Sequence, residues 1–68
     1  MAKTYKLKEA MRSQRHTIAS LSRVVGISPT ALFNKMHNTS EFNASEIMAI
    51  SEELKLSKED AYAIFFTS

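Results

Sequence analysis

The sequence predicts an all-α fold of five short helices, and two features lead to this prediction. Apolar residues recur three and four positions apart through most of the 68-residue chain, which is the spacing of one face of a helix. Ser, Thr and Asn, the residues that cap helices, stand in front of these periodic segments. We expect helices over residues 4–14, 17–25, 29–37, 44–54 and 58–66, within a single domain.

The helix over 4–14 is predicted from Leu7, Ala10 and Met11, which fall on one helical face. It should close the core beneath the two helices that follow. Arg15 and His16 form a short polar break after it, and Thr17 is a suitable N-cap for the next helix.

The helix over 17–25 has an apolar face formed by Ile18, Leu21, Val24 and Val25. It should end at Gly26, because glycine lacks the Cβ that makes the left-handed C-cap conformation costly.

The helix over 29–37 begins with a strong start signal. Ser28 is a good N-cap and Pro29 occupies the first helical position, where its missing N–H costs nothing. Ile27 should fill the angle between this helix and the previous one. Leu32 and Met36 give a narrow apolar seam, so the other faces of the helix are free to touch another molecule.

The helix over 44–54 follows a polar loop in which Phe42 should be a core anchor. Asn43 is its predicted N-cap, and Glu46 completes a box-like capping pattern. The inward side chains should be those of Ile47, Ile50 and Leu54, and Met48 should be more exposed.

The helix over 58–66 should follow a buried connector, Leu56, and an N-cap, Ser57. We expect Ala61, Ile64 and Phe65 to pack inward. Tyr62 and Phe66 are then left near the surface, and exposed aromatic residues close together indicate an interface. The alternative is that Phe66 folds back and completes the small core.

The charge of the chain is unevenly distributed. Residues 1–37 carry seven Lys and Arg against one Glu, a net charge of +6. Residues 38–68 carry two Lys against six acidic residues, a net charge of −4. The whole chain therefore has a net charge of +2. A basic half is typical of a polyanion-binding module. Ordinary solvated faces produce the same asymmetry, so the pattern alone does not decide.

Composition narrows the class of protein further. A domain near this size buries only about 60% of the surface of its unfolded chain, so stability should be modest. Because the chain has no cysteine, a reducing, cytoplasmic compartment is expected. No apolar run is long enough to span a bilayer and no signal peptide is recognisable, so we expect no membrane partner.

The spacing of Leu21, Gly26, Ile27, Ser28 and Leu32 resembles the helix-turn-helix of the phage repressor and Cro families. The segment LFNKMHNTSEFNASEIMAISEELKLSKEDAYAIFF is similar to the small Cro-like proteins of phages that infect Gram-positive bacteria. The resemblance covers about residues 6–66. It implies a lambda-repressor-like fold, a second helix that enters the DNA major groove, and a two-fold dimer whose recognition helices lie roughly 34 Å apart.

Four residues depart from the family pattern. Ser22 replaces Ala and is still small, whereas Ile18 stands where many relatives carry a phosphate-binding Gln. Phe33 replaces a polar residue, and Pro29 occupies a base-contacting position without a hydrogen-bonding side chain. The operator should therefore differ from those of better-known relatives.

Five residues on the outward face of the helix over 29–37 are the predicted base contacts. The Asn34 amide can pair with adenine, Thr30 can bond a base edge or touch a thymine methyl, and Pro29 and Phe33 suit thymine methyls. His37 completes this face.

Residues predicted to contact DNA phosphates combine cations with hydroxyl and amide groups near helix ends. They are Thr17, Ser20, Arg23, Ser28, Lys35 and Asn38, with Thr39 beside Asn38, and with Arg12, Arg15 and His16 as weaker flanking candidates. For Thr17, a plain helix cap without a ligand is an equally good interpretation.

Two functional hypotheses follow. The first is a sequence-specific DNA-binding regulator of Cro type, a homodimer through Tyr62 and Phe66 that occupies a double-stranded operator in the cytoplasm of a bacterial host. The second is a phage modulator or antirepressor that uses the same face, through Phe33, to bind a partner repressor. A nonspecific nucleic-acid coat protein is disfavoured by the low total charge.

Catalysis is not expected. His16 and His37 are too far apart in sequence for a helix-paired metal site, and with Gly26 as the only glycine no phosphate-cradling loop is present. A domain this small leaves no room for a deep pocket with a base and an oxyanion hole. We therefore predict no catalytic residue, no metal ligand and no cofactor.

Overall fold

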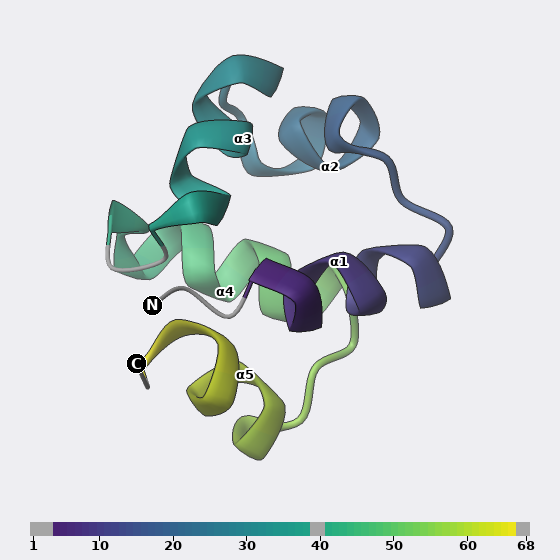
Figure 1. The fold of residues 1–68 in the computed structure, drawn as a ribbon, viewed down its shortest axis with the longest axis vertical. Coiled ribbons are helices and arrows are strands. Elements are labelled where there is room, and N and C mark those ends of the chain that lie inside the picture. The colour runs from purple at the N-terminus through teal and green to yellow at the C-terminus, as the bar shows by residue number, and fades with distance from the viewer. Residues whose placement is uncertain (1–3, 39–40, 67–68) are drawn as a thin grey trace.

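The described part of the protein consists of five α-helices joined by short linkers (Figure 1). The computed structural model describes residues 4–38 and 41–66, apart from the Thr4 side chain, and contains no strand in these ranges. The helices are α1 (Thr4–Ser13), α2 (Ile18–Val25), α3 (Pro29–His37), α4 (Ala44–Glu53) and α5 (Lys58–Phe65). The predicted all-α class is confirmed, and every helix end lies within one residue of its predicted position.

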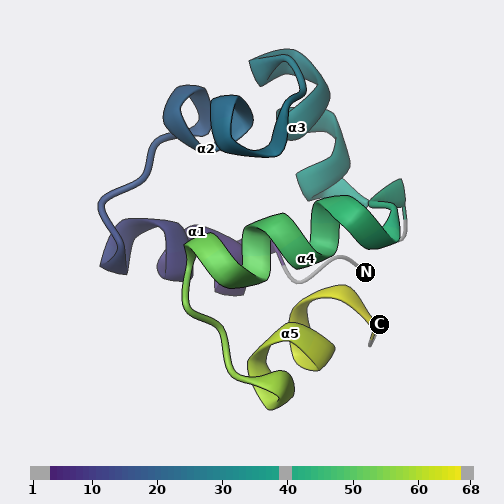
Figure 2. The same ribbon diagram turned by 180° about the vertical axis from the view of Figure 1, so that it is seen from behind.

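The helices surround a central core rather than forming layers. In Figure 1, α1 is nearest to the viewer, and in Figure 2, seen from behind, α4 is nearest; α2 and α3 lie above both and α5 lies below. The α3 helix packs on α1, the α2 helix packs on α4, and α5 contacts both α1 and α4. The pair α2–α3 is therefore held on a base formed by α1 and α4.

The core is a single cluster of buried apolar side chains to which every helix contributes. Phe42, from the loop before α4, meets Phe65 of α5 edge to face, with ring centroids 5.3 Å apart. Burial of this kind stabilises the fold by about 25 cal/mol for each Å² of apolar surface removed from water. The buried members are Leu7, Met11, Leu21, Leu32, Met36, Phe42, Ile50, Leu54, Ile64 and Phe65.

One predicted core residue of α2 is wrong. Val24 is 45% exposed, whereas Ser22 is buried and donates its hydroxyl to the Ala19 carbonyl at 2.8 Å. The inward stripe of α2 runs through Ile18, Leu21, Ser22 and Val25, and Val24 is turned about 100° from Val25 around the helix. The small Ser22 side chain lies where a bulkier residue would have held the neighbouring helices apart.

Three of the linkers share one plan. Each contains a residue of positive φ, namely Arg15 (59°), Gly26 (88°) or Lys55 (56°). The next residue, His16, Ile27 or Leu56, donates its N–H to the carbonyl five residues earlier, as in a Schellman motif. The third residue is the N-cap of the following helix, Thr17, Ser28 or Ser57. The sequences RHT, GIS and KLS are thus structurally equivalent.

The start of α4 is held by a complete capping box. The Asn43 side chain accepts from the Glu46 N–H at 2.8 Å, and the Glu46 carboxylate accepts from the Asn43 N–H at 3.0 Å. This confirms the predicted cap. Within the described ranges, no helix has the length and apolar character needed to cross a bilayer.

Candidate nucleic-acid interface

The α3 helix is fixed at its start and along one side. The Ser28 hydroxyl accepts the Ala31 N–H at 3.0 Å, and Pro29 occupies the first turn. Leu32 and Met36 are almost completely buried. Ala31 and Lys35 beside this stripe are half-buried, and the remaining side of the nine-residue helix faces outward.

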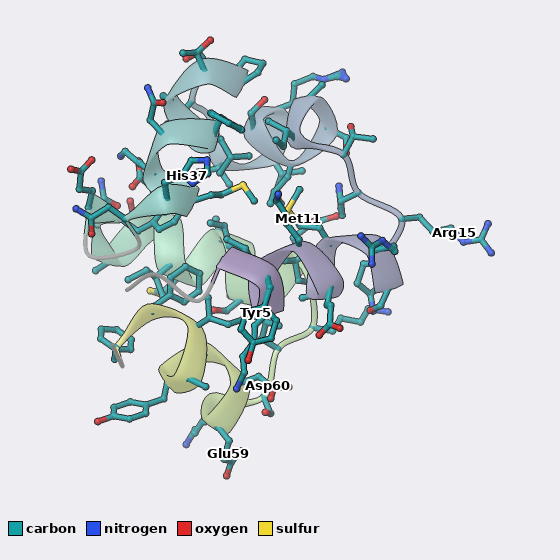
Figure 3. The ribbon with its side chains drawn as sticks, in the orientation of Figure 1. Tyr5, Met11, Arg15, His37, Glu59 and Asp60 are labelled. Carbon is teal, nitrogen blue, oxygen red and sulfur yellow. The ribbon has the colours of Figure 1, made fainter. Side chains whose placement is uncertain are left out.

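The five predicted base-contacting residues all lie on the exposed side of α3. Thr30 and Asn34 provide hydrogen-bonding groups, and Pro29 lies at the N-terminal end of the same side. Phe33 is 46% exposed. Its ring meets that of His37 edge to face, with centroids 4.6 Å apart, and Figure 3 shows His37 on the surface of α3. The face therefore combines two polar side chains with an ordered aromatic pair.

Thr17 and Ser20 form a reciprocal cap at the start of α2. The Thr17 Oγ1 accepts the Ser20 N–H at 3.1 Å, and the Ser20 Oγ accepts the Thr17 N–H at 2.9 Å. The predicted N-cap at Thr17 is confirmed. Both hydroxyl groups are engaged in these bonds, so the cap accounts for both side chains without a ligand.

Lys35, a predicted phosphate contact, is engaged by an acidic side chain of the protein itself. Its Nζ lies 2.8 Å from both carboxylate oxygens of Glu46 on α4, whose side chain is 8% exposed. The Lys35 hydrogen bond, followed by the Asn43 N–H and the positive charge of Lys35, outweighs the effect of burial and lowers the pKa of Glu46. Lys35 therefore joins α3 to α4.

His16, a weaker phosphate candidate, is likewise turned inward and engaged within the protein. Its Nδ1 lies 2.8 Å from the Ser20 Oγ and its Nε2 lies 2.7 Å from the Glu53 Oε2. In its linker, His16 occupies the same half-buried position as Ile27 and Leu56 in the two equivalent linkers. It ties the start of α2 to the end of α4.

The remaining predicted phosphate contacts are exposed. Arg23 lies on α2, and the ion pairs found among residues 4–38 and 41–66 do not include it. Ser28 is the exposed cap of α3. Asn38 ends α3, and its Nδ2 donates to the Glu41 carboxylate at 3.4 Å. Thr39 lies outside the described residues. Arg23 is thus the exposed cation of the α2–α3 pair.

The flanking cations Arg12 and Arg15 lie at the end of α1 and in the linker after it. Both are exposed, and Arg15 projects away from the body of the protein in Figure 3. The end of α1 and the linker to α2 therefore add two exposed cations to Arg23 of α2.

Tyr62 and Phe66 form an exposed aromatic pair at the end of α5. They are 59% and 60% exposed, and their rings stack with centroids 6.0 Å apart. The alternative in which Phe66 completes the core is wrong, because Phe65 fills that place against Phe42. The predicted surface position of Tyr62 and Phe66 is confirmed.

Comparisons of the chain with protein-family models, with curated proteins and with solved structures found no match. A functional proposal for this protein therefore depends on the geometry and chemistry of its own residues.

Proposed function

We propose that the protein is a sequence-specific DNA-binding regulator of the Cro type, and that α3 is its recognition helix. The observation that carries the proposal is the division of α3: Leu32 and Met36 anchor it, and Thr30 and Asn34 point outward beside Phe33. A helix fits the major groove, where an Asn amide pairs with adenine and a Thr contacts a base edge or a methyl group.

The charge distribution favours this orientation. The half of the sequence that contains α1, α2 and α3 has a net charge of +6, and Arg23 is exposed on α2 next to α3 in the chain. Cations that flank a recognition helix neutralise phosphates and fix the register of the protein on the duplex. Arg23 is the phosphate contact that we propose beside α3, since Lys35 is engaged by Glu46.

Regulation would follow from occupancy of an operator in the cytoplasm of a bacterial cell, where bound protein blocks polymerase or a competing repressor. A homodimer through the Tyr62–Phe66 pair would place two α3 helices on successive major grooves. The expected operator is therefore short and roughly palindromic.

Selection from a genome-fragment library of duplex DNA tests the proposal. The pure protein should enrich a short palindromic site and bind it at least about a thousandfold more tightly than random duplex. Affinities measured at several salt concentrations should show the slope expected for phosphate contacts. Weak, salt-sensitive binding with no enriched site would overturn the proposal.

A second candidate function is favoured by exposed apolar side chains on α2 and α3. Phe33 and Val24 are each close to half exposed on consecutive helices, and aromatic side chains are enriched at protein interfaces. A phage modulator or antirepressor would use this face to bind a partner repressor. Failure of the DNA selection together with saturable binding to a purified phage repressor would favour this function.

A further inference from the structure

A second feature of the surface is an open hollow between α1 and the α2–α3 pair. It has a volume of about 380 Å³ and is lined by residues of α1, the following linker, α2 and α3. Small-molecule sites in proteins occupy about 300–1,000 Å³, so the hollow has a suitable size for a small ligand. Figure 3 shows Met11 in the space between α1 and α2.

The floor and the rim of the hollow have opposite chemistry. Ile18 supplies half-buried apolar lining, and Met11 and Met36 close the hollow from below with only 5% and 1% of their surface exposed. Lys8, Arg12 and Arg15 supply cationic lining. Lys8 and Arg12 are four residues apart and share one side of α1, and Arg15 follows in the linker.

Among the residues that the structure describes, no acidic side chain lines this hollow. Another hollow, between α1 and α5, is lined by Lys6 and Lys55 together with Glu9 and Asp60, so its charges balance. The ion pairs of the described residues do not include Lys8, Arg12 or Arg15. His16 also lines the basic hollow, but both of its ring nitrogens are engaged by Ser20 and Glu53. The positive charge at the rim is therefore available to an anion.

We propose that this hollow binds a small organic anion, with an apolar ring or short chain on the methionine and isoleucine floor and a phosphate or carboxylate at the cationic rim. The apolar floor distinguishes this ligand from a nucleic-acid backbone, because a phosphodiester would contact only the cationic rim. Soft methionine side chains adapt to the shape of a bound ring. The hollow does not include Thr30, Asn34 or Arg23, whereas Arg12, Arg15 and Thr17 of its lining are also candidate DNA phosphate contacts. The inference concerns a ligand with an apolar part and does not depend on DNA binding.

Titration of the full 68-residue chain followed by ¹H–¹⁵N NMR tests the inference. The probes are phenyl phosphate, inorganic phosphate, which lacks the apolar part, and benzyl alcohol, which lacks the charge. Phenyl phosphate should shift the amide signals of Met11, Ile18 and Met36 in a saturable way. Its Kd should be at least about tenfold lower than that of either control, since each half of the ligand contributes.

Two variants locate the site. Arg12→Gln removes an exposed rim cation and should weaken phenyl phosphate binding at least about fivefold, a loss of about 1 kcal/mol. Lys58→Gln removes an exposed cation of α5, far from the hollow, and should leave binding unchanged. Amide signal dispersion of each variant shows that it remains folded.

Three outcomes would overturn the inference. Inorganic phosphate could bind as tightly as phenyl phosphate, which would mean general charge attraction. The shifted signals could lie around Lys58 rather than the hollow. Arg12→Gln could retain full affinity, which would remove the rim from the site.

Discussion

Gly26 and Lys55 both adopt a left-handed backbone conformation, which glycine accommodates at little cost and lysine does not. Gly26 has a φ of 88°, and a Cβ built there would meet nothing within 4 Å. Gly26→Ala should therefore lower the free energy of unfolding through the backbone alone, by about 1–2 kcal/mol. Lys55 has a φ of 56°, so Lys55→Gly should raise the free energy of unfolding, by up to about 1 kcal/mol.

Urea denaturation of the parent protein and both variants measures these changes. Lys55→Ala is the matched control, because it removes the same charge but keeps a Cβ, and it should give no gain. A gain equal to that of Lys55→Gly would show that charge rather than conformation was responsible.

At the residue scale, the sequence predicts a left-handed position only where its residue type signals one. Gly26 was predicted because glycine favours positive φ. Arg15 and Lys55 adopt the same conformation, but long basic side chains carry no signal for it, and the equivalence of RHT, GIS and KLS emerges only from the hydrogen bonds. Val24 was misplaced because the apolar residues of α2 outnumber the positions on its buried stripe.

At the scale of helices, Glu46 connects three segments. Its carboxylate accepts two hydrogen bonds from Lys35 of α3 and one from the Asn43 N–H before α4. These partners lower the pKa of Glu46 below its ordinary value of 4.5. As pH falls, the unfolded chain binds this proton first. The stability contributed by Glu46 is therefore complete above about pH 4.5 and is lost as pH falls through the folded pKa.

The measurement is the free energy of unfolding by urea between pH 7 and pH 3. Glu46→Gln should lower stability at pH 7 by about 1–3 kcal/mol, since Lys35 loses its charged partner. It should also remove part of the acid-induced decline that the parent protein shows. Glu52→Gln removes an exposed carboxyl group from the same helix, and an acid decline flattened equally by both variants would contradict the role of Glu46.

The Asn43–Glu46 capping box could be predicted from the sequence, whereas the Lys35–Glu46 ion pair could not. Asn43 and Glu46 are three residues apart and form a local pattern. Lys35 and Glu46 belong to different helices, and their contact depends on how α3 crosses α4. The same reason explains why the His16–Glu53 bridge, between residues 37 apart, was missed. The internal partners of Lys35 and His16 could not be predicted, whereas the exposure of the five outward residues on α3 depends only on helical periodicity and is confirmed.

At the scale of the whole molecule, the α5 aromatic pair should determine how the protein engages a two-fold operator. Phe66 is 60% exposed and stacks on Tyr62, so Phe66→Ser should disturb an interface without opening the core. In sedimentation and DNA-binding experiments, the variant should remain monomeric and lose affinity for a palindromic site at least about tenfold. Its affinity for a single half-site should be unchanged. Loss of half-site binding as well would indicate damage to the fold instead.

Specificity and general affinity should reside in different residues of the α2–α3 pair. Asn34→Ala should cost about 1–3 kcal/mol on the preferred operator and relax selectivity at one base pair, because it removes a base contact. Arg23→Gln should weaken binding to all duplexes by similar factors and reduce the salt slope by about one, because it removes a phosphate contact. Equal losses on operator and random DNA for Asn34→Ala would contradict its role.

Lys35→Met tests whether Lys35 joins α3 to α4 or contacts a DNA phosphate. The variant should lower the free energy of unfolding, because the Glu46 carboxylate loses its partner. The salt slope of DNA binding by the folded protein should stay unchanged.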